Sequence, residues 1–159
     1  MELSFNSPTY GQLSFTGVLE KILAYLRKEP ACRYRIIIGT DSQTKNSRRV
    51  DFVSAVVVHR VGAGGIYFWR RSVEERKYFL RQRIYEEALR SLRLAQQFIS
   101  AFPGEEILGY ELEIHVDIGA GGETRDMLAE IIGMVRGMGF NVRTKPESFG
   151  ASSVADRYA

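Results

Sequence analysis

A run of β-branched residues from Ile36 to Ile38, continued by Gly39 and Thr40 and then Asp41, constrains the fold more than any other stretch. Such a run predicts a strand at 34–40 that is buried on both faces of a sheet. The strand delivers the carboxylate of Asp41 to its carboxyl end, and an unpaired charge is costly inside a sheet. We therefore expect Asp41 to lie either in a solvated turn or in a functional site.

The periodicity of the remaining chain predicts an α/β domain. Helical spacing of apolar residues predicts a helix at 16–28, before the first strand, and Pro30 prevents its continuation. The elements expected after the first strand are strands at 51–61 and 66–73, a long helix at 74–101, a strand at 107–118, a helix at 123–138, a strand at 141–145 and a last helical turn or two at 153–159. Right-handed crossovers then give a five-stranded mixed sheet, flanked by helices, with strand order 3-2-1-4-5 counted from the strand at 34–40.

Size and composition favour one domain in a reducing compartment. We expect an extended arm at 1–14 and a single domain at 15–159 of this chain of 159 residues. The single cysteine, Cys32, excludes an internal disulfide, and we expect a cytoplasmic protein. Since no apolar run approaches the roughly 20 residues that cross a bilayer, we expect no membrane association. A net charge of +3 and a pI near 9.1 are compatible with a polyanionic partner.

Two acidic residues are placed by this topology at one edge of the sheet. Asp41 follows the first strand, and Asp117 lies near the end of the strand at 107–118 that should neighbour it. Each acid alone is an ordinary turn residue, but carboxylates gathered at the carboxyl ends of adjacent strands repel unless a cation lies between them. An oxygen-rich site of this kind suits Mg²⁺ or Mn²⁺. We interpret His115 as a hydrogen-bonded strand residue rather than as a ligand.

The long helix offers a further acid, and helix geometry distinguishes Glu87 from Glu86. At about 100° per residue, Glu87 falls at the margin of the buried face, close to Leu80, Leu94 and Phe98. Glu86 falls among solvent-facing residues. Glu87 is therefore the acid that we expect to turn inward, where it needs a cation or a hydrogen-bond partner.

Three arginines, Arg76, Arg83 and Arg90, form a stripe beside Glu87 on the same helical wheel. Such a stripe is typical of a solvated helix face with intrahelical ion pairs. Beside an acidic metal site, it can instead carry a nucleic-acid backbone past the cleft.

Three segments of the chain resemble the YkuK family of ribonuclease H-like proteins. They are Ile38-Gly39-Thr40-Asp41-Ser42-Gln43, Glu113-Ile114-His115-Val116-Asp117-Ile118-Gly119, and Lys145-Pro146-Glu147-Ser148 followed by Ser152-Ser153-Val154-Ala155-Asp156-Arg157. The resemblance implies the ribonuclease H fold, with acids on the first strand, the first crossover helix, the fourth strand and a carboxyl-terminal helix. Asp41, Glu87, Asp117 and Asp156 match these four places.

The resulting functional prediction is a divalent-metal-dependent nuclease. Asp41, Glu87, Asp117 and Asp156 would hold two Mg²⁺ or Mn²⁺ ions, with Asp41 bridging them, for hydrolysis of RNA, DNA or a hybrid. One alternative is a ribonuclease H-like binding module without catalytic activity, since fold does not establish function. Another is a phosphohydrolase of small molecules, such as nucleotides, that uses the same metals.

Overall fold

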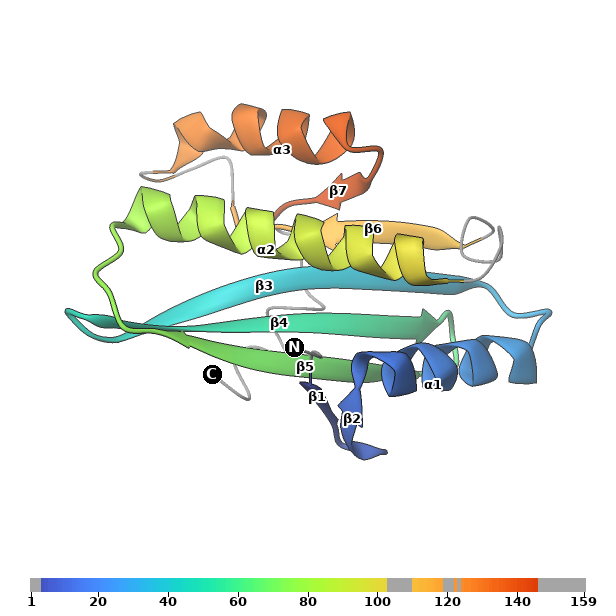
Figure 1. Cartoon of the computed structure of the whole chain (residues 1–159). Helices are drawn as coiled ribbons and strands as arrows, with labels where there is room; N and C mark the ends of the chain where they lie inside the picture. The colour runs from blue at the N-terminus through green and yellow to red at the C-terminus, as the bar shows by residue number, and fades with distance from the viewer. Residues whose placement is uncertain (1–3, 103–109, 119–121, 123, 146–159) are drawn as a thin grey trace.

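The protein is built around one seven-stranded sheet with helices against it (Figure 1). The computed structural model describes residues 4–102, 110–118, 122 and 124–145. The strands follow the order β2-β1-β5-β4-β3-β6-β7. The elements are β1 (Ser4–Ser7), β2 (Gly11–Ser14), α1 (Phe15–Lys28), β3 (Tyr34–Asn46), β4 (Arg49–Arg60), β5 (Gly65–Glu74), α2 (Leu80–Ala101), β6 (Glu111–His115), the short 3₁₀ helix η2 (Arg125–Met127), α3 (Leu128–Gly137) and β7 (Asn141–Arg143).

The sheet is mixed, and it is larger than predicted. Strands β3, β4 and β5 form an antiparallel meander, whereas β6 pairs parallel to β3 and β7 pairs parallel to β6. We expected five strands, but the hairpin β1–β2 extends the β5 edge and gives seven. Within this sheet, the five strands that follow α1 in the described chain lie in the order β5-β4-β3-β6-β7.

The amino-terminal segment is part of the sheet instead of an extended arm. Strands β1 and β2 pair antiparallel, and Asn6 lies opposite Trp69 of β5. The side chain of Phe5 is fully buried, and the Oγ of Ser7 accepts hydrogen bonds from backbone N–H groups in the turn. Gly11 supplies the positive φ of 74° that ends this turn. Burial of one aromatic residue on a short strand was too weak a periodic signal to predict the hairpin.

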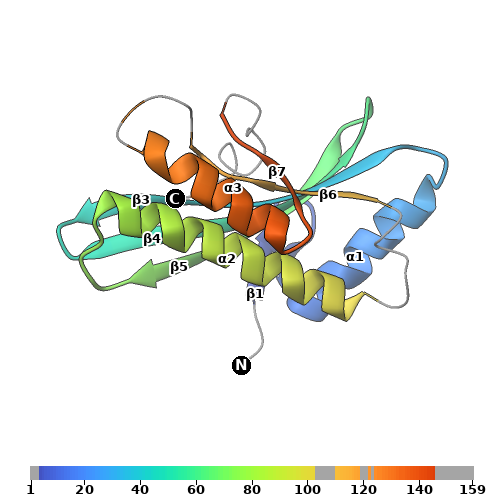
Figure 2. The ribbon, with the colours of Figure 1, turned by 90° about the horizontal axis from the view of Figure 1, so that it is seen from above.

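All three helices pack against one core cluster on the same face of the sheet. Val18 and Ile22 of α1, Ala95 of α2 and Ile131 of α3 share this core with alternate strand residues such as Ile36. Helix α1 starts cleanly because the Oγ of Ser14 accepts a hydrogen bond from the N–H of Gly17 at 3.1 Å. Figure 2 shows α2 and α3 side by side over the strands. Among the described residues, no helix is both long and apolar enough to cross a membrane.

Strand β3 continues well past the point where we expected it to end. It pairs with β4 from Tyr34 to Asn46, whereas its ladder with β6 stops at Gly39, opposite His115. Asp41 is therefore not the end of the strand, because the polar residues after it still pair with β4. It lies just beyond the end of the parallel ladder.

Other element boundaries also differ from the predicted ones. Strand β5 continues to Glu74, so α2 begins at Leu80 rather than at residue 74. The 3₁₀ helix η2 delays the start of α3 to Leu128. The last helical turn expected at 153–159 lies outside the described residues.

Candidate functional site

Three of the four predicted acids line one pocket between α2 and the edge of the parallel ladder. This pocket has a volume of about 360 Å³, and its walls are Asp41, Ser42, Leu80, Arg83, Ile84, Glu87, Asp117, Thr124 and Lys145. We call it the acidic pocket. The fourth predicted acid, Asp156, lies outside the described residues.

The pairing of β3 with β6 brings Asp41 and Asp117 to the same level of the sheet. Gly39 and His115 are the last register partners of this parallel ladder, and each acid follows two residues later. The Oδ1 of Asp41 accepts a hydrogen bond from the N–H of Ser42 at 2.9 Å. The Oδ1 of Asp117 lies 3.1 Å from the Nζ of Lys145. The chain after β7 therefore supplies a cation to the acid that follows β6.

Glu87 enters the pocket from α2, and its carboxyl group is buried, with 8% of the residue exposed. Burial raises its pKa to about 8; the nearby charges of Asp41 and Asp117 add to this rise, while a hydrogen bond from Ser42 and the charge of Arg83 oppose it. The Oγ of Ser42 donates this hydrogen bond to Oε2 at 2.6 Å. The helical wheel prediction is confirmed, because Glu87 faces inward.

The neighbouring acid, Glu86, belongs to a different environment. Its Oε1 lies 2.9 Å from the Nε of Arg90, one turn later on α2, and its side chain is 22% exposed. This intrahelical pair is the ordinary arrangement for a solvated helix face.

Three hydroxyl groups lie behind the acidic pocket and connect α2 to β3 and β4. The Oγ of Ser91 donates to the Oγ1 of Thr40 at 2.9 Å, and it also lies 3.1 Å from the carbonyl oxygen of Glu87. Thr40 and Ser54 share a further hydrogen bond at 2.8 Å. Sequence reasoning missed these residues, since isolated serines and threonines carry no periodic signal. They hold the Glu87 turn of α2 against the strand that carries Asp41.

The predicted arginine stripe does not form as a stripe. Arg76 precedes α2, so the helical wheel does not apply to it, and its guanidinium lies 4.2 Å from the centre of the Tyr78 ring. Arg90 is paired with Glu74 and with Glu86. Arg83 alone of the three lines the acidic pocket, where its Nη1 donates to Thr44 at 2.9 Å.

The chemistry of the acidic pocket suits a hard divalent cation, because its candidate ligands are all oxygen atoms. A cation beside Glu87 would also offset the repulsion that raises its pKa. Within the part of the chain that the structure describes, however, no three His, Cys, Asp or Glu side chains are close enough together to hold a metal ion. Ser42, rather than Asp41, makes the direct contact with Glu87.

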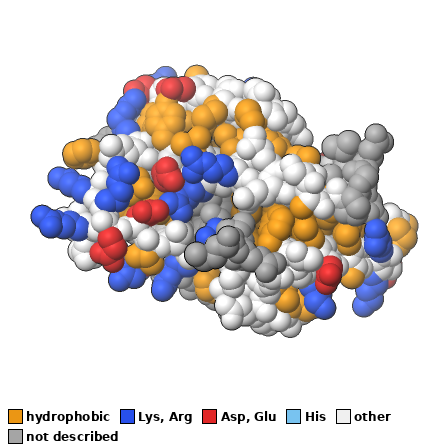
Figure 3. Space-filling view, viewed as in Figure 1, with side chains coloured by type: hydrophobic (Ala, Val, Ile, Leu, Met, Phe, Trp, Pro, Cys, Tyr) orange, Lys and Arg blue, Asp and Glu red, His pale blue; other side chains and the backbone are white. Residues whose placement is uncertain are grey.

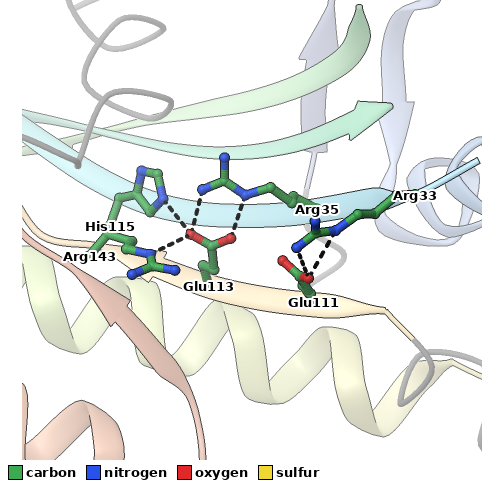
Figure 4. A network of polar contacts seen from close by, with 6 residues as sticks. All are labelled: Arg33, Arg35, Glu111, Glu113, His115 and Arg143. Atoms are coloured by element: carbon green, nitrogen blue, oxygen red, sulfur yellow. Dashed lines mark hydrogen bonds and ion pairs between the residues drawn. The ribbon is translucent and has the colours of Figure 1, made fainter. Parts of the chain in front are cut away.

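A second polar cluster ties together β3, β6 and β7 on the sheet face opposite α2 (Figure 4). Glu113 is buried and accepts two hydrogen bonds from Arg35, at 2.6 and 2.7 Å. His115 and Arg143 contact the same carboxylate, at 3.2 and 3.3 Å. Burial alone would raise the pKa of Glu113, but hydrogen bonds and positive charge from Arg35, together with the His115 contact, lower it to about 2.

This Glu113 cluster fixes the strand that leads to Asp117. His115 is a hydrogen-bonded strand residue, as predicted, and burial lowers its pKa. The alternating acids of β6 were visible in the sequence, but their partners on β3 and β7 follow only from the strand register.

Basic side chains gather at the end of the molecule that carries the β3–β4 turn and the start of α2 (Figure 3). A few acidic side chains are interspersed among them. This end also contains Arg83 and Leu80 of the acidic pocket. The mixed but largely basic surface is compatible with a polyanion approaching the pocket.

The chain belongs to the ribonuclease H-like family, whose model matches residues 17–159. Membership of this family indicates a function related to nucleic acid. Within the family, the chain is 31% identical over 171 residues to a protein of Bacillus subtilis (strain 168) named "Uncharacterized protein YkuK", and the alignment covers 97% of this chain and 95% of that protein. It therefore belongs with YkuK, as its motifs predicted. No solved structure matches the chain significantly.

Proposed function

We propose that this protein is a divalent-metal-dependent nuclease that hydrolyses phosphodiester bonds in RNA, DNA or a hybrid, with its site in the acidic pocket. The observation that carries the proposal is the buried carboxyl group of Glu87, whose pKa of about 8 is raised by burial and by the nearby Asp41 and Asp117. Three carboxyl groups around one pocket are stabilised when a cation neutralises them.

The residues of the pocket have distinct roles in this proposal. Asp41, Glu87 and Asp117 are the ligands for Mg²⁺ or Mn²⁺, and Asp156 is a fourth ligand that the family resemblance implies. Ser42 orients Glu87 through its hydrogen bond at 2.6 Å. Arg83, one of the walls of the pocket, attracts the anionic backbone of the substrate. A bound divalent cation supplies the activation of water and the stabilisation of the leaving oxygen that this chemistry requires.

The test is cleavage of labelled RNA, DNA and RNA–DNA hybrid with Mg²⁺ or Mn²⁺. We expect Asp41→Asn and Asp117→Asn each to lower the rate by about 100-fold or more, as happens when a group that stabilises transition-state charge is lost. The matched control is Asp126→Asn, because Asp126 is an exposed acid, paired with Arg81, outside the pocket. Equal cleavage by the wild type and the Asp41 variant would overturn the proposal.

A second candidate function is a nucleic-acid or protein binding module that keeps the fold without the chemistry. Specific contacts favour it: Lys145 already neutralises Asp117, and Ser42 already satisfies Glu87. In such a module these contacts are permanent, and the acids bind no metal.

Titration with Mn²⁺ separates the two functions. For a nuclease we expect binding that Asp41→Asn abolishes and that Lys145→Ala strengthens by up to about fivefold, since the exposed ion pair with Asp117 competes with the metal by no more than about 1 kcal/mol. Lys45→Ala, at an exposed lysine near the end of β3, is the matched control. If the protein has no affinity for Mn²⁺, or if neither Asp41→Asn nor Lys145→Ala changes this affinity more than the control does, the result favours the binding module.

A further inference from the structure

A second pocket lies on the other side of α2, against β4 and β5. Its volume is about 240 Å³, and its walls are Phe5, Ser54, Arg70, Ser72, Arg90, Arg93, Leu94 and Gln97. We call it the arginine pocket. It brings together guanidinium groups from strand β5 and from helix α2, and none of the described residues that form its walls is acidic.

The charges of the three arginines are unequally neutralised. Arg90 is held by Glu74 and Glu86, and its guanidinium lies 4.2 Å from the centre of the Phe52 ring. In contrast, Arg70 and Arg93 form no ion pair within the described part of the chain. Two guanidinium groups therefore keep their charge available beside a pocket whose described walls include no carboxylate.

The uncharged walls of the pocket add hydrogen-bond donors. The hydroxyl of Ser54 shares a hydrogen bond of 2.8 Å with Thr40, in which either oxygen can donate, and the same side chain lines the pocket. Ser72 and Gln97 provide a further hydroxyl and an amide. Guanidinium, hydroxyl and amide donors around one cavity are the groups that bind phosphate oxygens.

The same hydroxyl groups place the arginine pocket beside the acidic pocket. Thr40 precedes Asp41 on β3, and Ser91 follows Glu87 by one turn of α2. Arg90 and Arg93 follow Glu87 by three and six residues, which is within about 10 Å along the helix axis. A strand crossing α2 can therefore reach both pockets.

We propose that the arginine pocket binds a backbone phosphate of the same nucleic-acid strand whose cleaved phosphodiester lies in the acidic pocket. Arg70 and Arg93 provide the charge, and Ser54 and Ser72 complete the contacts with the oxygen atoms. This assignment rests on the proposed function for the identity of the strand. Arg93 is exposed, so the pocket opens toward the solvent and admits a phosphate that is part of a chain.

The experiment measures binding of a fluorescent single-stranded oligonucleotide by anisotropy, with EDTA present and Asp41→Asn as the background, so that no cleavage is needed. We expect Arg70→Ala and Arg93→Ala each to weaken binding and to reduce the slope of log affinity against log salt by about 0.7, the value for one lost phosphate contact on a single strand. The matched control is Arg136→Ala on α3, another exposed helical arginine without an ion pair in the described part of the chain.

Unchanged affinity and salt slope in both pocket variants would overturn the inference. Thermal melting of each variant reports whether the fold is retained, and the exposed position of Arg93 makes its variant the safer of the two. Competition by inorganic phosphate at concentrations as low as those of the oligonucleotide would also overturn it, because the pocket would then take a free anion. If the wild type cleaves no substrate, the nuclease proposal fails, but the effect of the two arginine variants on binding is unaffected. The two failures can therefore be told apart.

Discussion

At the scale of single residues, the protonation of Glu87 is strongly determined by its surroundings. Its carboxyl group is buried, accepts a hydrogen bond from Ser42 and lies near Asp41 and Asp117. Glu87 in the folded protein holds its proton up to a pH of about 8, whereas a free glutamate has a pKa of 4.5. Proton binding, rather than a protein cation, therefore neutralises this group when no metal is present.

We expect the free energy of unfolding to fall as the pH rises from 4.5 to about 8 in EDTA, because the folded state retains a proton that the unfolded chain has lost. The contribution of Glu87 to this fall is at most about 1.4 kcal/mol per pH unit. Urea denaturation at several pH values measures it. Glu87→Gln removes the slope, and Glu86→Gln is the control that keeps it. A slope that survives in Glu87→Gln would show that another group is responsible.

The position of Glu87 could be predicted because one helix face is periodic in apolar residues, so that a single acid at its margin stands out. The partners of that acid could not be predicted. Ser42 reaches it only because β3 continues beyond Asp41, and Lys145 reaches Asp117 only because β7 runs parallel to β6. Contacts between distant segments depend on strand register, which periodicity does not determine.

At the scale of elements, the Glu113 cluster holds β6 against β3, and Glu111, two residues earlier on β6, provides a contrast. Glu113 is buried and paired with Arg35 of β3, whereas Glu111 pairs with Arg33, the residue just before β3, and these two side chains are 43% and 69% exposed. Equivalent chemistry therefore occurs twice at the same strand spacing, once inside the protein and once at its surface.

We expect Glu113→Ala to lower the free energy of unfolding by about 3–5 kcal/mol, because it leaves Arg35 partly buried without its carboxylate. Glu111→Ala should cost no more than about 1 kcal/mol, as is usual for an exposed pair. The difference should be fully present above a pH of about 4.5, where a glutamate of the unfolded chain is ionised, and should be lost as the pH falls from there to about 2, the pKa of Glu113 in the folded protein.

Chemical denaturation of both variants decides this prediction. Equal losses for Glu113→Ala and Glu111→Ala would mean that the buried network does not stabilise the fold. The double variant Arg35→Met with Glu113→Leu should recover much of the loss, because apolar side chains of similar volume replace the pair.

At the scale of the whole molecule, the amino-terminal hairpin β1–β2 both extends the edge of the sheet and forms part of the wall of the arginine pocket. Phe5 is fully buried and is also one of the walls of that pocket. Its ring lies 6.3 Å from that of Phe15, at the start of α1. The first strand in the sequence thus packs beneath the first helix.

We expect Phe5→Ala to cost about 3–5 kcal/mol, the usual result of removing a large aromatic side chain from a core. Phe79→Ala, at a side chain with 63% exposure, should change stability by no more than about 0.5 kcal/mol. Thermal and urea unfolding measure both. A neutral effect of Phe5→Ala would mean that residues 4–14 are an arm, as their composition predicted, and not part of the core.

The α/β class and the crossover that brings β6 beside β3 could be predicted because buried strands and amphipathic helices alternate along the chain. The hairpin β1–β2 and the length of β3 could not. Thr44 and the residues around it are polar and exposed, so nothing in their pattern distinguishes a paired strand from a turn. They remain in the sheet because β4 pairs antiparallel with them, with a register shift between Thr44 and Asn46.

The unequal lengths of the two ladders on β3 have a consequence for motion. Asp41 lies within a long antiparallel hairpin, whereas Asp117 follows a strand of 5 residues that its buried cluster holds in place. Because β6 is short, its attachment to β3 depends on the buried Glu113 cluster as well as on the backbone ladder. Removal of that cluster would let Asp117 move while Asp41 remained fixed in the hairpin, so the integrity of the acidic pocket depends on contacts made on the opposite face of the sheet.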